Sequence, residues 1–153
     1  HKPQNDGKES KPGDLIEIIR GNYSHWAVYV GNGYVVHFGA PSSSIGGVDG
    51  IVMKEKLEDV AGKDKWRVNN SLDKKYKPLP PDEIVKKACS LVGVSLKYHL
   101  TKYNCEHFAT EMRYGKAESR QVGPSTPHQG WGMGQMDLVP TFLATCVCVC
   151  ACL

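Results

Sequence analysis

The sequence lacks any apolar run long enough to form a membrane-spanning helix. Its most apolar stretch, Leu138 to Leu153, has about sixteen residues, whereas crossing the hydrocarbon core takes about 20. The first ten residues are polar, so we expect no secretory signal there. Basic and acidic residues nearly balance, 19 Lys and Arg against 16 Asp and Glu, which argues against a nucleic-acid-binding protein. With 153 residues, the chain has room for one ordinary globular domain.

The sequence also lacks the cysteine and histidine spacings of a metal site or a disulfide framework. Cys89 and Cys105 stand alone, and the other four cysteines crowd the last eight residues. We therefore predict free thiols and a reducing, cytoplasmic location. No C-x-x-C or H-x-x-x-H motif is present. Zinc bound by His25, His37 and Cys105 is a weaker alternative because a structural zinc site normally has four ligands, so we predict no metal and no cofactor.

Composition divides the chain into three parts. Residues 1–10 are polar and without hydrophobic periodicity, which is typical of a disordered arm. Residues 11–119 contain the patterned segments and are expected to form the one folded domain. Residues 120–153 change to Gly, Pro, Ser, Gln and Met and then to an apolar, cysteine-rich end, which predicts a flexible linker and tail.

The clearest local pattern is a β-hairpin over residues 25–38. Two runs rich in valine and aromatic residues flank Gly31-Asn32-Gly33, a typical hairpin turn. A three-residue loop makes one face of the hairpin wholly apolar or aromatic and places His25 and His37 together on the other face, on adjacent strands. A two-residue loop would separate the two histidines and mix both faces. We therefore prefer the three-residue loop.

Further elements follow from local composition and capping residues. Strands are predicted over residues 15–20, 51–54 and 65–68, with an irregular loop over 39–50 and a helical turn over 57–62. Asp82 is the predicted N-cap of one helix. Asn104 is the predicted N-cap of another, which begins at Cys105 and stops at Gly115. Together these elements predict an α+β fold, with an antiparallel β-sheet packed against helices.

Cys105 is the candidate nucleophile because it begins a helix. The unpaired N–H groups and partial positive charge at a helix N-terminus favour thiolate over thiol. A nucleophilic thiol also needs a base and a group that orients the base, and the same-face pair His25 and His37 can supply both. The alternatives are a cysteine that only packs in the core and histidines that only hydrogen-bond. His107 points elsewhere on the helix, and we interpret it as structural.

Several motifs resemble the phospholipase A and acyltransferase family, also called HRAS-like suppressors. They are KPGDLIE at 11–17, HWAVYVG at 25–31, NCEHF at 104–108 and RYG at 113–115. This family is related to lecithin retinol acyltransferase in the NlpC-type superfamily of thiol hydrolases. The resemblance covers roughly residues 11–121 and implies an NlpC-like fold. It also implies Cys105 as nucleophile, His25 as general base and His37 as the residue that orients His25.

The resemblance implies a calcium-independent phospholipase A with O- and N-acyltransferase activity. The expected substrates are glycerophospholipids such as phosphatidylcholine and phosphatidylethanolamine, whose acyl group passes through an S-acyl-cysteine intermediate. We expect a monomer that associates peripherally with a membrane surface. A retinol-type O-acyltransferase and a catalytically silent module that regulates growth through its surface are the alternatives.

The sequence departs from the family pattern in two places. The stretch from Phe38 to Met53 is shorter than is common in the family, so the substrate preference is left open. The chain also ends in a cysteine-rich tail, whereas family members commonly end in one membrane-spanning segment. Cys150 to Leu153 matches the spacing of a prenylation signal, and an unmodified tail is the simpler interpretation.

Overall fold

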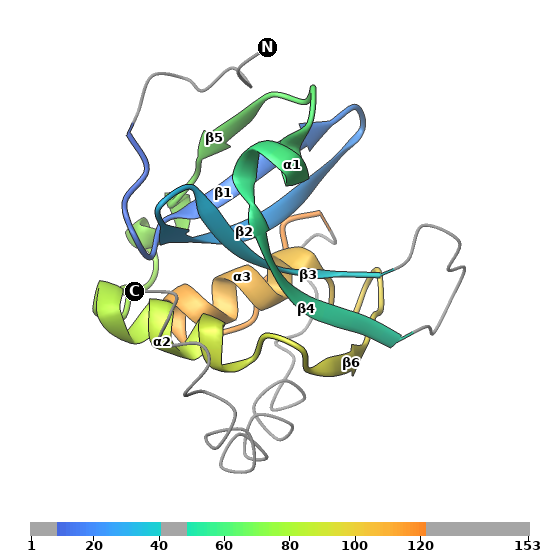
Figure 1. Cartoon of the computed structure of the whole chain (residues 1–153). Coiled ribbons are helices and arrows are strands. Elements are labelled where there is room, and N and C mark those ends of the chain that lie inside the picture. Colours follow the sequence, from blue (N-terminus) through green and yellow to red (C-terminus); the bar gives the residue numbers. More distant parts are fainter. Residues whose placement is uncertain (1–8, 41–48, 122–153) are drawn as a thin grey trace.

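A computed structural model describes residues 9–40 and 49–121 of the chain (Figure 1). Most of the predicted arm and tail, and the middle of the predicted loop 39–50, lie outside the described residues. Along the chain the elements are β1 (Leu15–Arg20), β2 (Tyr23–Gly31), β3 (Tyr34–Gly39), β4 (Asp49–Lys56), α1 (Leu57–Ala61), β5 (Trp66–Val68), the 3₁₀ helix η1 (Ser71–Lys74), α2 (Pro81–Ser90), β6 (Ser95–Lys97) and α3 (Cys105–Tyr114).

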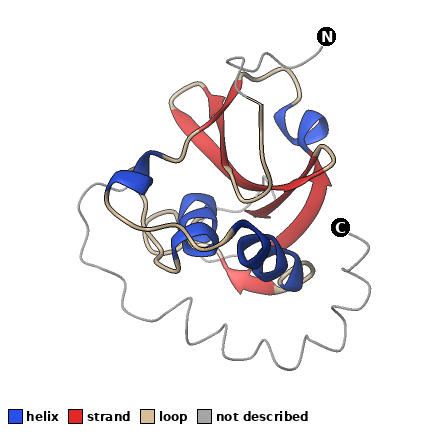
Figure 2. Cartoon of the chain, turned by 90° about the vertical axis from the view of Figure 1, so that its left-hand side faces the viewer, coloured by secondary structure: helices blue, strands red, loops and turns tan. Residues whose placement is uncertain are grey.

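The strands form one antiparallel sheet in the order β5-β1-β2-β3-β4-β6. Helices α2 and α3 lie against one face of this sheet and the short helix α1 lies against the other (Figure 2). This arrangement confirms the α+β fold with an antiparallel sheet packed against helices. The strands predicted from β-branched and aromatic runs are all present, and β6 falls in a stretch whose sequence pattern is ambiguous.

Each face of the sheet contributes to its own hydrophobic core. On the α3 side, Val28 and Val36 pack with Phe38 and with Phe108 of the helix, and all four side chains are fully buried. On the α1 side, a second cluster includes Ala27 and Val35. Burying a large apolar side chain stabilises the fold by about 1.5–3 kcal/mol. Because burial is this favourable, the alternation of apolar residues along β2 and β3 determines which face of the sheet each side chain occupies.

The hairpin between β2 and β3 has a shorter loop than expected. Gly31 pairs with Tyr34, so only Asn32 and Gly33 form the turn. Both have positive φ, 54° and 81°, which is the type I′ geometry that suits the right-handed twist of a hairpin. The predicted three-residue loop is therefore wrong.

The predicted face of each histidine is nevertheless confirmed, because an irregularity in β2 compensates for the shorter loop. The register shifts between Tyr29 and Gly31, and beyond the shift Tyr29 pairs with Val35. This is the pairing that a three-residue loop would have produced. A β-bulge adds one residue to one strand, so it restores the register that a two-residue loop alone would have inverted.

Helix α2 begins differently from the prediction. Asp82 lies inside the first turn and is not the N-cap, a position that Pro80 takes without any side-chain hydrogen bond. Pro81 is the first helical residue, where its missing N–H costs nothing because that group has no partner within the helix. The Asp82 carboxylate still lies in the first turn, where a negative charge interacts favourably with the helix dipole.

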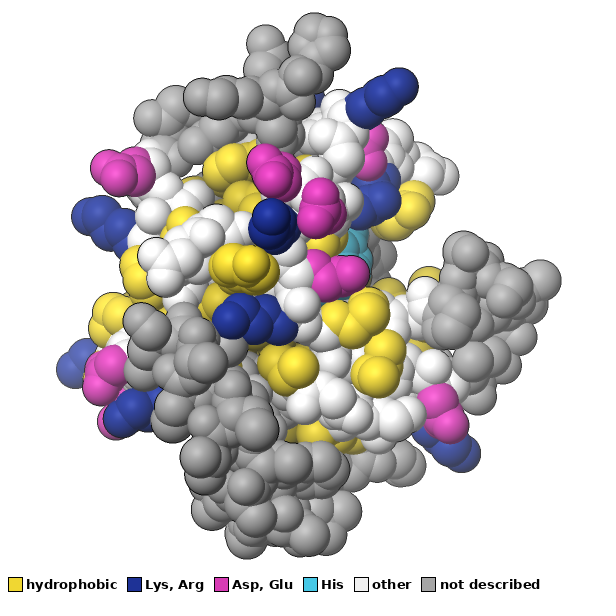
Figure 3. Space-filling model, viewed as in Figure 1, with side chains coloured by type: hydrophobic (Ala, Val, Ile, Leu, Met, Phe, Trp, Pro, Cys, Tyr) yellow, Lys and Arg dark blue, Asp and Glu magenta, His cyan; other side chains and the backbone are white. Residues whose placement is uncertain are grey.

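The surface is mixed in charge on the face that Figure 3 shows, where basic and acidic side chains are interspersed among apolar ones. This face therefore offers no wide basic patch of the kind that binds nucleic acid. Among residues 9–40 and 49–121, no helix is long and apolar enough to cross a membrane.

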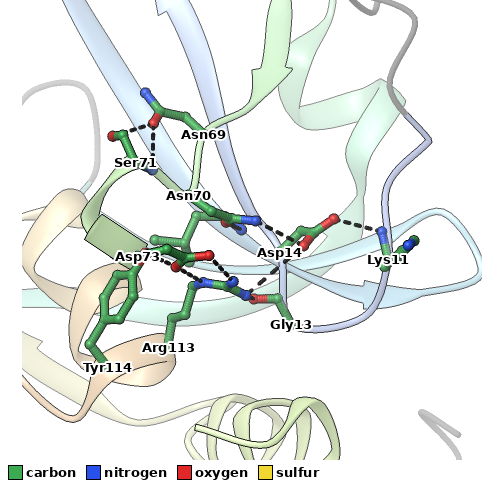
Figure 4. Close-up of polar contacts among 10 residues, drawn as sticks. Lys11, Gly13, Asp14, Asn69, Asn70, Ser71, Asp73, Arg113 and Tyr114 are labelled. Atoms are coloured by element: carbon green, nitrogen blue, oxygen red, sulfur yellow. Dashed lines mark hydrogen bonds and ion pairs between the residues drawn. The ribbon is translucent and has the colours of Figure 1, made fainter. Parts of the chain in front are cut away.

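A polar network fixes the C-terminal end of α3 to the start of β1 (Figure 4). The Arg113 guanidinium donates to the Gly13 carbonyl at 2.9 Å and to Asp73 of η1 at 2.9 and 3.1 Å. The Tyr114 hydroxyl donates to the same Asp73 carboxylate at 2.6 Å. Asn70 donates to Asp14 at 3.0 Å. Because these bonds join segments far apart in the chain, they hold α3 in a defined position against the sheet.

Candidate active site

Helix α3 begins at Cys105, and the preceding residue caps it as predicted. The Asn104 side-chain oxygen accepts from the backbone N–H of Glu106 at 2.9 Å and of His107 at 3.2 Å. His107 returns the interaction, because its Nδ1 accepts from the backbone N–H of Asn104 at 3.0 Å. This is a capping box. His107 therefore contributes to the helix terminus, in agreement with its structural interpretation.

The cysteine sulfur lies against an unpaired edge of β2. Pairing between β2 and β3 stops at Val28 and Val36, so the part of β2 before Val28 has no neighbour on that side within the sheet. The Cys105 thiol donates to the Ser24 carbonyl at 3.9 Å, and the backbone N–H of Trp26 hydrogen-bonds the sulfur. The thiol is therefore close to the backbone on both sides of His25.

His25 and His37 are in direct contact on the face of the hairpin that also carries Ala27 and Val35. His25 Nε2 lies 2.8 Å from His37 Nδ1. The two rings are nearly perpendicular, with centroids 5.0 Å apart. The structure thus brings together the two histidines that the alternation of β2 and β3 placed on one face.

Two further side chains join this group, and sequence reasoning missed both. His37 Nε2 lies 2.6 Å from Glu55 Oε2 on β4. Tyr98, just after β6, hydrogen-bonds Cys105 through its hydroxyl. Glu55 follows the alternation of β4, but only the pairing of β4 with β3 shows that it reaches a histidine. Tyr98 lies in the stretch with an ambiguous pattern, so its sequence carries no signal of this role.

Burial determines the protonation of the histidine pair. It lowers the pKa of His25 from 6.5 to about 3, and His37 and Arg20 shift it in the same direction. Burial also lowers the pKa of His37, although the adjacent Glu55 raises it in part. Both rings are therefore neutral at pH 7.

The thiol is also neutral, contrary to the expectation from its position on the helix. Burial raises the pKa of the Cys105 thiol, whereas hydrogen bonds from Trp26 and Tyr98 lower it. Cys105 is only 4% exposed. Removing a thiolate from water therefore costs more free energy than the helix N-terminus and these two hydrogen bonds provide. The expected preference for thiolate is therefore wrong for this structure.

The segment after α3 is hydrogen-bonded to β2 next to the site. The Ser24 backbone N–H, on the unpaired edge of β2, donates to the Gln121 side chain at 3.0 Å. The buried Glu106 carboxylate accepts from the Ser119 hydroxyl at 2.8 Å and from the Arg120 backbone N–H at 3.1 Å. These bonds attach residues 119–121 to the first turn of α3, next to the cysteine.

No group of three or more His, Cys, Asp or Glu side chains that could hold a metal ion occurs within the part of the chain that the structure describes. Cys89 and Cys105, the cysteines in that part, are both buried and free of disulfide bonds. The side chains that the structure brings together at the site are two imidazoles and a carboxylate in one series, and a thiol and a phenol in contact.

Comparisons with known proteins identify the family of the chain. A family model described as lecithin retinol acyltransferase matches residues 8–118. The chain is 49% identical over 145 residues to phospholipase A and acyltransferase 3 from Homo sapiens, with 86% of this chain and 89% of that protein covered. It is 53% identical over 121 residues to phospholipase A and acyltransferase 2 from Homo sapiens, with 72% and 74% covered. The corresponding type 3 protein from Mus musculus is 47% identical over 150 residues, with 89% and 92% covered.

Proposed function

Because this chain belongs to the phospholipase A and acyltransferase family and contains its lecithin retinol acyltransferase domain, we propose that Cys105, His25 and His37 form its catalytic triad, in an NlpC-like thiol hydrolase fold. The observation that carries the proposal is the position of the Cys105 sulfur beside the backbone of His25, whose ring contacts His37 at 2.8 Å. The substrates are glycerophospholipids, including phosphatidylcholine and phosphatidylethanolamine.

The first half-reaction moves an acyl group from the lipid to the enzyme. His25 takes the thiol proton as the sulfur attacks the ester carbonyl carbon, and a tetrahedral oxyanion forms. Collapse of this intermediate breaks the ester C–O bond, and the lysophospholipid oxygen leaves with the proton that His25 held. The products are a lysophospholipid and an S-acyl form of Cys105.

The neutral state of the site fits general-base catalysis at the moment of attack. The raised pKa of Cys105 and the lowered pKa of His25 disfavour a preformed thiolate and imidazolium. Proton transfer therefore accompanies formation of the S–C bond. His37 accepts a hydrogen bond from His25 and orients that ring for the transfer.

Two donors beside the sulfur are suited to stabilise the oxyanion. The backbone N–H groups of Glu106 and His107 are already used by Asn104. The Cys105 backbone N–H instead donates to the Tyr98 hydroxyl, and burial next to Cys105 raises the pKa of Tyr98. Tyr98 therefore keeps its proton at neutral pH, and both groups can turn to the developing negative oxygen.

The second half-reaction determines which activity is observed. His25 removes a proton from the acceptor, the acceptor attacks the thioester, and the sulfur leaves and recovers its proton. Water as acceptor gives phospholipase A activity. The amine of phosphatidylethanolamine gives N-acylation, and a lysophospholipid hydroxyl gives O-acylation. No step uses a metal or other cofactor.

The substrates also suggest where the protein acts. Glycerophospholipids reside in bilayers, so the protein works as a monomer associated peripherally with a membrane surface. The same proposal places the protein in the cytoplasm.

The proposal is tested with phosphatidylcholine labelled in its acyl chain. Cys105→Ser and His25→Ala should reduce turnover by at least about a hundredfold, because each removes a group that takes part directly in the chemistry. Mass spectrometry of the wild-type protein should find the label on Cys105. Adding phosphatidylethanolamine or retinol identifies the acceptor that gains the label.

Cys89→Ala is the matched control, since it removes the other buried thiol within the described residues and should keep the label on Cys105. Turnover by Cys105→Ser at the wild-type rate would eliminate the triad and favour a non-catalytic role for the site.

A further inference from the structure

We propose that Glu55 is a positioning residue that determines which nitrogens of the two histidines carry protons, and thereby which nitrogen of His25 acts as the base. This inference rests on the proposed function, because it assigns a task within the same site. Its central observation is an unbroken series of hydrogen bonds, 2.8 Å from His25 to His37 and 2.6 Å from His37 to Glu55.

The sheet register places Glu55 where this contact requires it. His37 pairs with Met53 and Val35 pairs with Glu55 across β3 and β4, so Glu55 is the diagonal neighbour of His37 on the same face. Diagonal neighbours lie close enough for long side chains to meet. Three adjacent strands, β2, β3 and β4, therefore each contribute one member of the series.

The chemistry of the last contact determines the protons of the whole series. A carboxylate only accepts hydrogen bonds, so His37 Nε2 must carry a proton and donate it to Glu55. In a neutral ring this leaves His37 Nδ1 without a proton, and Nδ1 then accepts from His25 Nε2–H. His25 Nδ1 is thus the nitrogen with a free lone pair.

This assignment agrees with the position of the thiol. In a histidine side chain, Nδ1 is the ring nitrogen nearer the backbone. The Cys105 sulfur lies by the backbone next to His25, 3.9 Å from the Ser24 carbonyl oxygen. In the proposed mechanism, the nitrogen that Glu55 leaves free is the one that takes the thiol proton.

Positive charge develops on His25, and Glu55 lies at the opposite end of the same series. When His25 accepts the thiol proton, its Nε2–H becomes a stronger donor to His37, and His37 in turn to the carboxylate. Arg20 is a charged group that acts on both rings, and it opposes their protonation. Arg20 itself donates to the Val60 carbonyl at 2.6 Å and lies 3.7 Å from Asp64. Its guanidinium therefore interacts with these groups, and Glu55 is the charged residue that contacts His37.

The contact is suited to orientation more than to stability. The Glu55 side chain is 47% exposed, whereas that of His37 is 7% exposed. An exposed carboxylate contributes little to folding free energy. Substituting Glu55 should therefore leave the fold intact and change the chemistry.

The test compares E55A and E55Q with E58Q, which removes an exposed carboxylate nearby in α1. For E55A, kcat should fall about 10- to 100-fold, the order of effect known for outer partners of functional histidines, with KM unchanged. E55Q keeps an oxygen acceptor for His37 Nε2–H, so its kcat should lie between those of wild type and E55A. E58Q should match wild type.

A second measurement does not depend on activity. Nitrogen-15 NMR of the histidine rings should show a protonated Nε2 on His37 in the wild-type protein and in E55Q, and a mixture of protonated nitrogens in E55A. Wild-type kcat in E55A, or an unchanged His37 proton pattern in that variant, would overturn the inference. If the wild-type protein shows no thiol-dependent turnover, the proposed function fails, while the NMR comparison still decides the role of Glu55.

Discussion

At the scale of single residues, the site depends on groups kept neutral by burial. Position at a helix N-terminus argues for a thiolate, but the buried Cys105 has a raised pKa, and the buried His25 has a lowered one. A neutral thiol and a neutral imidazole are each less costly to bury than the ion pair. In the proposed mechanism, proton transfer is thereby delayed until a substrate arrives.

The lowered pKa of His25 predicts a dependence of stability on pH. An unfolded chain binds a proton on this histidine below pH 6.5, whereas the folded protein resists protonation until about pH 3. Stability should therefore fall as pH drops from 6.5 towards 3. In His25→Gln, which cannot titrate there, the midpoint of urea unfolding should fall less steeply over this range.

His99→Gln, outside the histidine pair, serves as the control and should follow the wild-type pH profile. A His25→Gln slope as steep as that of wild type would contradict the assignment of this pH dependence to His25.

At the scale of elements, the hairpin shows which features local sequence patterns can predict and which they cannot. The alternation of apolar residues placed both histidines on one face, and the pairing of Tyr29 with Val35 confirms it. The same pattern could not reveal that a two-residue turn and a bulge replace the three-residue loop. Both arrangements produce the same faces, so side-chain alternation does not distinguish them.

The capping box of α3 leads to a prediction about that helix. Asn104→Ala removes the acceptor for two backbone N–H groups, so the free energy of unfolding should fall by about 1 kcal/mol. Turnover should fall as well, because the cap holds the turn that carries Cys105. Urea unfolding and the labelled-lipid assay measure the two effects.

Asn104→Asp retains a side-chain oxygen acceptor and should recover most of the lost stability. Equal losses in the alanine and aspartate variants would show that capping is not what Asn104 contributes.

At the scale of the whole molecule, the contacts around Arg113 connect β1, η1 and α3 (Figure 4). The motif KPGD and the later RYG lie about a hundred residues apart in the chain, yet Gly13 and Arg113 are hydrogen-bonded. The network lies at the end of α3 away from Cys105. It thus fixes the direction of the helix that presents the thiol.

Removing the shared acceptor of this network should destabilise the fold. Asp73→Ala leaves the Arg113 side chain, 10% exposed, and the Tyr114 hydroxyl without their carboxylate. A loss of about 1–3 kcal/mol in unfolding free energy is expected, measured by urea denaturation at an unchanged m-value.

Lys75→Ala breaks the more exposed pair with Glu118 and should leave the unfolding midpoint close to that of wild type. Equal midpoints for Asp73→Ala and wild type would show that the network contributes no net stability.

The sequence by itself determined strands β1 to β5, the helix that begins at Cys105 and the shared face of His25 and His37, because side-chain alternation and capping are local properties of the chain. Only the tertiary structure decided that β2 separates from β3 before Val28 and that the thiol lies against the backbone of Ser24 and Trp26. It alone also decided that Glu55 reaches His37 and that burial keeps the thiol neutral. These features depend on which strands become neighbours and on how much water the folded chain excludes from the site. Both depend on residues that are far apart in the sequence.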